Sequence, residues 1–160
     1  MAPRRTKIEI EIRKATWRLA WPTAAADAKR LLALAAGWPG LKGNAGGEIA
    51  VVFADDAELQ DLNARFRGKN RPTNVLSFPD AENPPGGGIA LAFETISAEA
   101  RAQSKPFVNH AKHMILHGFL HLHGHDHDKP SAARLMEGLE IAMLARMGIP
   151  NPYFIEKPRA

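Results

Sequence analysis

The alternation of apolar and polar residues predicts four β-strands. Apolar and charged residues alternate from Ile8 to Arg13, which is the period of a half-buried strand. The run from Glu48 to Ala54 is almost wholly apolar and predicts a strand buried on both faces. Two further apolar runs predict short strands, Val75 to Phe78, ended by Pro79, and Ile89 to Phe93.

Helical periods and capping residues predict five helices. They are expected over 23–36, from Asp55 or Asp56 to Gly68, from Ser97 to Gln103, from Pro106 to Gly124, and from Pro130 to Met147. Strands and helices mix without regular βαβ alternation, so the expected fold class is α+β, with a mixed, mostly four-stranded sheet packed with helices. The length of 160 residues fits a single domain over 1–160, with an N-terminal strand region (1–20) and a flexible tail (154–160).

Composition restricts the chemistry and the location that we expect. The chain contains no cysteine, which excludes disulfides and thiolate metal sites. It has 21 Lys and Arg against 17 Asp and Glu, and this net charge of +4 suits a polyanionic partner such as RNA as well as it suits an ordinary solvated surface. No apolar run approaches the ~20 residues that cross a bilayer. We therefore expect a cytoplasmic protein without membrane contact.

All seven histidines lie between His110 and His127, and their spacing predicts a metal site. His117 and His121 are four residues apart, so on a helix they share one face. Gly124 permits the left-handed turn that ends a helix, and His127 follows that turn as a third ligand. Three imidazole ligands leave the fourth position of a zinc ion open, as in catalytic sites. We expect one Zn²⁺ per chain.

The remaining histidines offer alternatives to this ligand set. A ladder of His113, His117 and His121 along one straight helix is the rival set, although three such ligands converge poorly. His110 is expected to face solvent, and His123 to be packed or exposed. His125 is a candidate substrate contact, and the Asp126 carboxylate, or that of Asp128, is a candidate partner that orients a ligand imidazole.

The residue after the first ligand argues against a peptidase. Zinc proteases with this histidine spacing carry Glu directly after the first histidine, where it acts as general base. Here that position is Gly118. The usual carboxylate base is therefore missing.

Two separate motifs resemble those of the YbeY family of bacterial rRNA-processing metalloproteins. The first is His117-Gly-Phe-Leu-His121-Leu-His-Gly124-His-Asp126-His127. The second comprises Leu62-Asn63, Phe66-Arg67-Gly68-Lys69 and Pro72-Thr73-Asn74-Val75-Leu76-Ser77-Phe78-Pro79. The resemblance extends from about Gly47 to Tyr153. The family commonly has Gly-Asp where this chain has Gly87-Gly88, and Tyr where it has His125.

The resemblance implies a compact α+β fold with a metzincin-like zinc helix that ends in a glycine turn. It implies a single-strand-specific, zinc-dependent endoribonuclease that matures the 3′ end of 16S rRNA and takes part in ribosome quality control. The family's zinc ligands correspond to His117, His121 and His127, and its functionally important arginine to Arg67. The implied partners are rRNA, the small ribosomal subunit and its associated factors; DNA is not expected.

These residues support a hypothesis for the chemistry. His117 and Arg67 are the expected catalytic residues, with zinc-bound water as nucleophile and the Arg67 fork as phosphate clamp. The neighbouring Arg65, Lys69 and Arg71 form a candidate track for RNA, although an ordinary solvated patch has the same composition. The general base is unassigned among Asp126, His125 and His113. The alternatives are a non-catalytic, zinc-stabilised ribosome-biogenesis binding factor and, less favoured, a metalloprotease.

Overall fold

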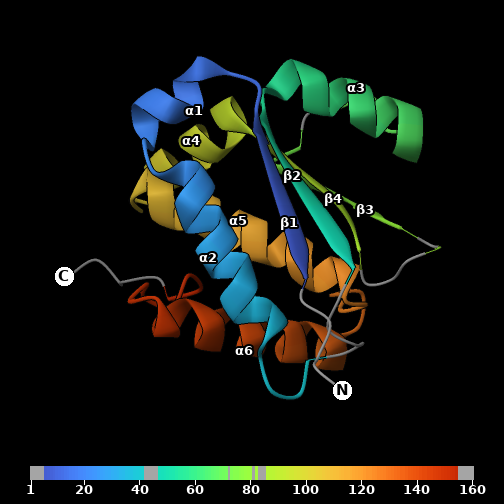
Figure 1. Ribbon diagram of the computed structural model, residues 1–160, viewed down its shortest axis with the longest axis vertical. Helices are drawn as coiled ribbons and strands as arrows, with labels where there is room; N and C mark the ends of the chain where they lie inside the picture. Colours follow the sequence, from blue (N-terminus) through green and yellow to red (C-terminus); the bar gives the residue numbers. More distant parts are fainter. Residues whose placement is uncertain (1–5, 42–46, 72, 81, 83–85, 155–160) are drawn as a thin grey trace.

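A mixed four-stranded sheet forms the centre of the molecule. The computed structural model describes residues 6–41, 47–71, 73–80, 82 and 86–154. The strands are β1 (Lys7–Ile12), β2 (Glu48–Ala54), β3 (Val75–Pro79) and β4 (Gly87–Ala92), in the order β1-β2-β4-β3 (Figure 1). β1, β2 and β4 are parallel, whereas β3 pairs antiparallel with β4 at one edge of the sheet. The α+β class predicted from the sequence is confirmed.

Six helices surround this sheet within the described residues. They are α1 (Ala15–Ala20), α2 (Ala24–Ala36), α3 (Asp56–Arg67), α4 (Phe93–Ala102), α5 (Phe107–Leu122) and α6 (Pro130–Arg146). The Asp55 carboxylate caps α3 by accepting a hydrogen bond from the Glu58 backbone N–H at 2.9 Å. Pro106 and Pro130 lie at the starts of α5 and α6, as predicted.

The helices divide unequally between the two faces of the sheet. α2 and α5 pack on one face over Val51, Phe53 and Leu91, and α6 packs on the outer side of α5 (Figure 1). α3 packs on the other face, over a smaller cluster centred on Leu59 and Leu76. We call these the α5 face and the α3 face. Because side chains alternate along a strand, neighbouring residues of β3 contribute to opposite faces.

The structure corrects two of the predicted elements and adds a helix that was not predicted. β2 is not buried on both faces: Glu48 and Ala50 are exposed, because α3 does not cover the N-terminal half of the strand. α4 begins at Phe93, so Ser97 lies inside it and does not cap it. Helix α1 was not predicted; it is short and buries Trp17, whose indole N–H donates to the Ala54 carbonyl at 2.8 Å.

In the described part of the chain, no helix combines the length and apolar character needed to cross a membrane. Of the tail predicted over 154–160, all but Phe154 lies outside the described residues.

Candidate active site

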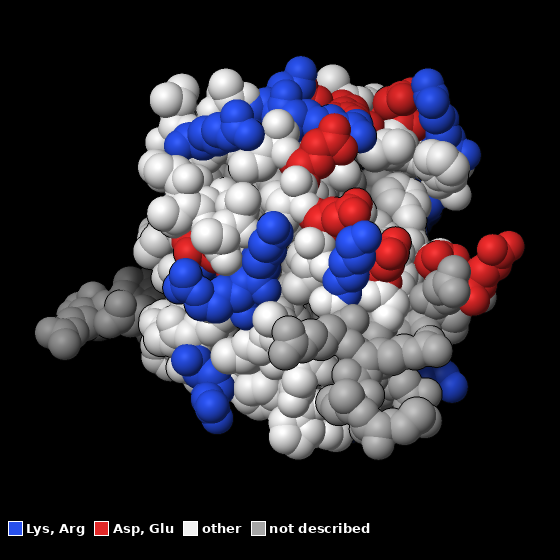
Figure 2. Space-filling view, viewed as in Figure 1, with Lys and Arg blue, Asp and Glu red and all other residues white. Residues whose placement is uncertain are grey.

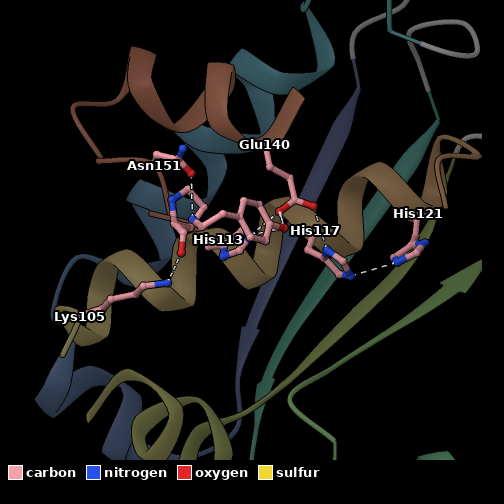
Figure 3. Close-up of polar contacts among 8 residues, drawn as sticks. Lys105, His113, His117, His121, Glu140 and Asn151 are labelled. Atoms are coloured by element: carbon pink, nitrogen blue, oxygen red, sulfur yellow. Dashed lines mark hydrogen bonds and ion pairs between the residues drawn. The ribbon is translucent and has the colours of Figure 1, made fainter. Parts of the chain in front are cut away.

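Three imidazoles converge where α5 ends and the chain turns back. His117 and His121 lie on successive turns of α5, and their Nε2 atoms are 3.1 Å apart. Gly124 has φ +85°, and this left-handed conformation reverses the chain and places His127 beside the other two rings. One ligand atom from each of the three histidines lies within 4.8 Å of the others. Figure 3 shows His117 and His121 pointing toward each other from α5.

These three residues fit a divalent metal ion. Ligand atoms ~2.0–2.1 Å from a tetrahedral zinc ion are about 3.3 Å from one another. The Nε2 pair of His117 and His121 already has this spacing, and the ligand atom of His127 lies within 4.8 Å of both. Burial, and the nearby His117 and His127, lower the pKa of His121, which keeps its ring neutral and able to bind a metal. The group predicted from the sequence could therefore hold a metal ion.

A buried carboxylate of α6 orients the first of these ligands. The Glu140 side chain is fully buried, and its Oε1 lies 3.0 Å from Nδ1 of His117 (Figure 3). Its Oε2 accepts a hydrogen bond from the Tyr153 hydroxyl at 2.6 Å and also contacts Nε2 of His113. An ionised carboxylate only accepts hydrogen bonds, so Nδ1 of His117 carries the proton and Nε2 presents its lone pair to the other two histidines.

The same contacts keep Glu140 ionised inside the protein. Burial by itself raises the pKa of this carboxyl, but hydrogen bonds with His113, His117 and Tyr153 outweigh burial and lower the pKa to about 2. The Tyr153 hydroxyl responds oppositely: burial and the adjacent Glu140 carboxylate raise its pKa. Tyr153 therefore stays protonated and acts as a donor.

Glu140 was missed in the sequence analysis, although its position carries a signal. The buried positions of α6 are Met136, Glu140, Met143 and Leu144, so a charged residue interrupts an apolar helical stripe. A charge at such a position requires a partner. The histidines of α5 were the candidate partners for this carboxylate.

The other histidines agree with the sequence-based expectations to different degrees. His110 does not face solvent: it is buried, and its Nε2 lies 3.3 Å from Glu99 Oε1. His113 contacts Glu140 and is absent from the convergent group, so the rival ladder gains no geometric support. His123 is buried against the ring of Phe119, as predicted for a packed residue. The His125 side chain is 4% exposed, which leaves little surface for the predicted substrate contact.

Asp126 lies between His125 and His127 in the sequence, but unlike His125 it is not buried. It is exposed, and its Oδ1 accepts a hydrogen bond from the Asp128 backbone N–H at 3.3 Å. The carboxylate that contacts a ligand imidazole in the structure is that of Glu140.

Gly118 explains why this chain has no carboxylate next to its first ligand. A Cβ atom at this position would lie 2.9 Å from Ile89 Cγ2 and 3.1 Å from Ser77 Oγ. Position 118 therefore faces the sheet at close range, and a glutamate there would collide with β4. The Ser77 hydroxyl donates to the Gly118 carbonyl at 3.1 Å, which joins β3 to the helix that carries the metal ligands.

Arg67 reaches the same strand from the α3 face. The side chain is exposed at the end of α3, and its Nη2 donates to the Ser77 carbonyl at 2.7 Å. Ser77 thus contacts Arg67 through its carbonyl and the metal-site helix through its hydroxyl. The tertiary structure brings together the two motifs that are separate in the sequence.

The other basic residues follow Arg67 in a turn with a defined local structure. Gly68 ends α3 in the left-handed conformation, with φ +65°. The Asn63 side chain donates to the Arg71 carbonyl at 3.0 Å, and the Asn63 carbonyl accepts from the Lys69 N–H at 3.2 Å. Lys69 and Arg71 are exposed, whereas Arg65 forms an ion pair of 3.2 Å with Asp61. On the face shown in Figure 2, basic and acidic residues are interspersed, and the described residues of that face form no continuous basic field.

The comparisons with known proteins place these features in a family. The family model described as endoribonuclease YbeY matches residues 9–148. A relative from Rhodopseudomonas palustris, named endoribonuclease YbeY, is 44% identical over 154 residues, covering 91% of this chain and 80% of the relative. Another relative of that name, from Chelativorans sp., is 52% identical over 112 residues, covering 66% of this chain and 69% of its own length.

A solved structure supports the fold. The solution structure of a protein from Thermotoga maritima superposes with a TM-score of 0.58 at 21% identity, covering 96% of this chain and 99% of that protein. At this identity the likeness supports the fold alone. The family model and the curated relatives cover most of the chain, and the chain therefore belongs to the endoribonuclease YbeY family.

Proposed function

We propose that this chain is a zinc-dependent endoribonuclease that cuts single-stranded RNA and matures the 3′ end of small-subunit rRNA, with a part in ribosome quality control. Members of its family are named as endoribonucleases, so the chain is an enzyme that acts on RNA. The observation that carries the finer proposal is the convergence of three imidazoles beside the strand that Arg67 contacts.

The proposed division of labour follows from the contacts. His117, His121 and His127 would hold the zinc ion, and Glu140 fixes the orientation of the first. A zinc ion in such a site lowers the pKa of a water ligand and stabilises negative charge on a phosphoryl oxygen. Arg67 uses one N–H donor on the Ser77 carbonyl, which leaves others of its five for a phosphate of the substrate.

Burial narrows the choice of the group that accepts the proton during cleavage. Of the three candidates, His113 is occupied by Glu140, and His125 is buried. The Asp126 carboxylate is exposed and directly precedes the ligand His127. We propose Asp126 as the base, in place of the imidazole-orienting role predicted from the sequence.

The proposal is tested by cleavage of a labelled single-stranded RNA, with zinc content measured in the same samples. Wild type, His117→Ala and Arg67→Ala are compared. We expect the His117 variant to lose both zinc and cleavage. The Arg67 variant should keep its zinc while its kcat falls by about 100-fold or more, because it loses a donor to the developing negative charge.

Two results contradict the proposal. Equal cleavage by all three proteins would trace the activity to a contaminating nuclease and favour the non-catalytic ribosome-biogenesis factor, tested by sedimentation with small subunits. Zinc loss in the Arg67 variant would make that residue structural.

A further inference from the structure

We propose that a hollow beside Arg67 binds one unpaired nucleobase of the RNA substrate, so that the enzyme contacts a base as well as the phosphate backbone. This inference rests on the proposed function. The hollow, called here the Phe66 hollow, lies between the end of α3 and β3 and has a volume of about 620 Å³. It is lined by Leu62, Phe66, Arg67, Ser77, Phe78 and Pro79.

The Phe66 ring is the first reason for assigning a ligand to this hollow. Leu59, Leu62 and Phe66 form an apolar stripe along α3, and a residue of such a stripe is expected in the core. Instead it is 67% exposed, while Leu59 of the same stripe is fully buried. Phe66 contacts the Phe78 ring edge-to-face, with centroids 5.5 Å apart and planes at 68°. Two aromatic rings thus line a hollow whose volume lies in the range of small-molecule sites.

The charges around the hollow identify the class of ligand. Arg67 lines it, and the exposed Lys69 and Arg71 follow in the next turn of chain. An apolar peptide needs no cationic rim, whereas a nucleotide has an aromatic base joined to an anionic phosphate. Proteins that bind single-stranded nucleic acid combine these two elements, aromatic stacking surfaces and basic side chains along the backbone. The Phe66 hollow has both.

The position of the hollow relative to the metal site is the third reason. Ser77 lines the hollow, and its hydroxyl contacts the carbonyl of Gly118, next to the ligand His117. β3 is an edge strand, so an RNA strand that passes this edge would place a phosphate at Arg67 and a neighbouring base on Phe66, while Ser77 connects both to the helix that carries His117. A base in a duplex is stacked on its neighbours and is not available for this contact. The hollow accounts for a preference for single strands.

The test measures coupling between Phe66 and one base. A fluorescent, 2′-O-methylated RNA of eight nucleotides, shown on a gel to stay intact through the titration, is bound to the full chain as purified, and anisotropy gives the Kd. Each base is replaced in turn by an abasic unit. We expect one position at which base removal weakens binding to wild type by about 5- to 150-fold, the range for one stacked base.

The same series is repeated with Phe66→Ala, Phe66→Leu and Phe66→Tyr. Phe66→Ala should weaken binding of the complete RNA by a similar factor, and base removal at the sensitive position should then cost nothing more. Phe66→Leu keeps the apolar bulk but not the ring and should behave like Phe66→Ala, whereas Phe66→Tyr should bind like wild type. Leu19→Ala, which truncates an 83% exposed side chain on α1, is the matched control and should change nothing.

Three outcomes would overturn the base site. The first is unchanged binding of the RNA by Phe66→Ala, and the second is a set of losses that add independently at every abasic position. The third is retained RNA binding by Phe66→Ala with lost association with small subunits, which would assign the hollow to a protein partner. The abasic series on wild type shows by itself whether a single base is held, even if a variant folds poorly. Because the probe is not cleaved, base-dependent binding without cleavage of ordinary RNA would contradict the proposed function and leave the base site intact.

Discussion

The α5 face of the sheet buries and pairs the polar side chain of Glu140, whereas the α3 face leaves Phe66 and Arg67 exposed at an edge. On the α5 face, the fully buried Glu140 carboxylate contacts two histidines, His113 and His117. On the α3 face, Phe66 and Arg67 lie at the surface over a small core. A metal site needs ligands with fixed orientations, and an RNA contact needs accessible groups. The α5 face suits the first requirement and the α3 face suits the second. The two hydrogen bonds of Ser77 connect the faces.

The largest effect is expected from breaking the buried network. Glu140→Ala removes the acceptor for His113 and His117, and each buried group left without its partner costs about 1–3 kcal/mol. Loss of an outer partner of a ligand imidazole also weakens metal affinity by about 10- to 100-fold. Urea unfolding and competition with a chromophoric chelator measure the two effects.

The control for Glu140 lies on the same helix. Glu137→Ala removes a carboxylate that contacts neither histidine and should leave zinc affinity unchanged. Equal zinc affinity in wild type and Glu140→Ala would show that the network is a feature of the core and not of the metal site.

A smaller effect is expected where α5 approaches the sheet. Gly118→Ala introduces a Cβ 2.9 Å from Ile89 Cγ2, so helix and sheet must separate. Such overpacking costs about 1–3 kcal/mol in the free energy of unfolding. Gly138→Ala is the matched control: it is also a helical glycine, but its Cβ meets nothing within 4 Å. It should stabilise α6 by about 0.5–1 kcal/mol. Similar effects of the two substitutions would contradict the close packing of α5.

The connection between the two faces is tested by Ser77→Ala. This change removes the hydrogen bond to the Gly118 carbonyl but keeps the backbone carbonyl that holds Arg67. We expect a loss of about 0.5–1.5 kcal/mol in the free energy of unfolding. The kcat for RNA cleavage should fall far less than in Arg67→Ala, since the arginine keeps its contact. A fall as large as that of Arg67→Ala would give the Ser77 hydroxyl a role in the reaction itself.

The smallest effect is expected for a paired carboxylate near the surface of the α5 face. Burial tends to raise the pKa of Asp27, but hydrogen bonds from Thr23 and Trp21 lower it below 3.8. The stabilisation from a group with a lowered pKa is complete above its unfolded value and is lost as the pH falls through its folded value. Asp27→Asn should therefore be less stable than wild type at pH 6, and the difference should shrink below about pH 4. A difference that does not change between pH 6 and pH 3 would contradict this role of the charge.

The sequence by itself determined most of the elements and the group of three histidines that could hold a metal ion. Strand alternation, the prolines at helix starts and the glycine after α5 are local signals, because they depend on backbone conformation over a few residues. The spacing of His117, His121 and His127 is also local: one helical turn and one chain reversal bring the three rings together.

Only the tertiary structure decided which groups surround that site. Glu140 lies on the next helix, 23 residues after His117, and Arg67 precedes Ser77 across a loop, so no periodicity links them. The burial of His110 and the exposure of Phe66 likewise depend on what other elements cover. The periodicity of an element shows which residues share a face, but the packing of the whole chain decides whether that face meets protein, metal or solvent.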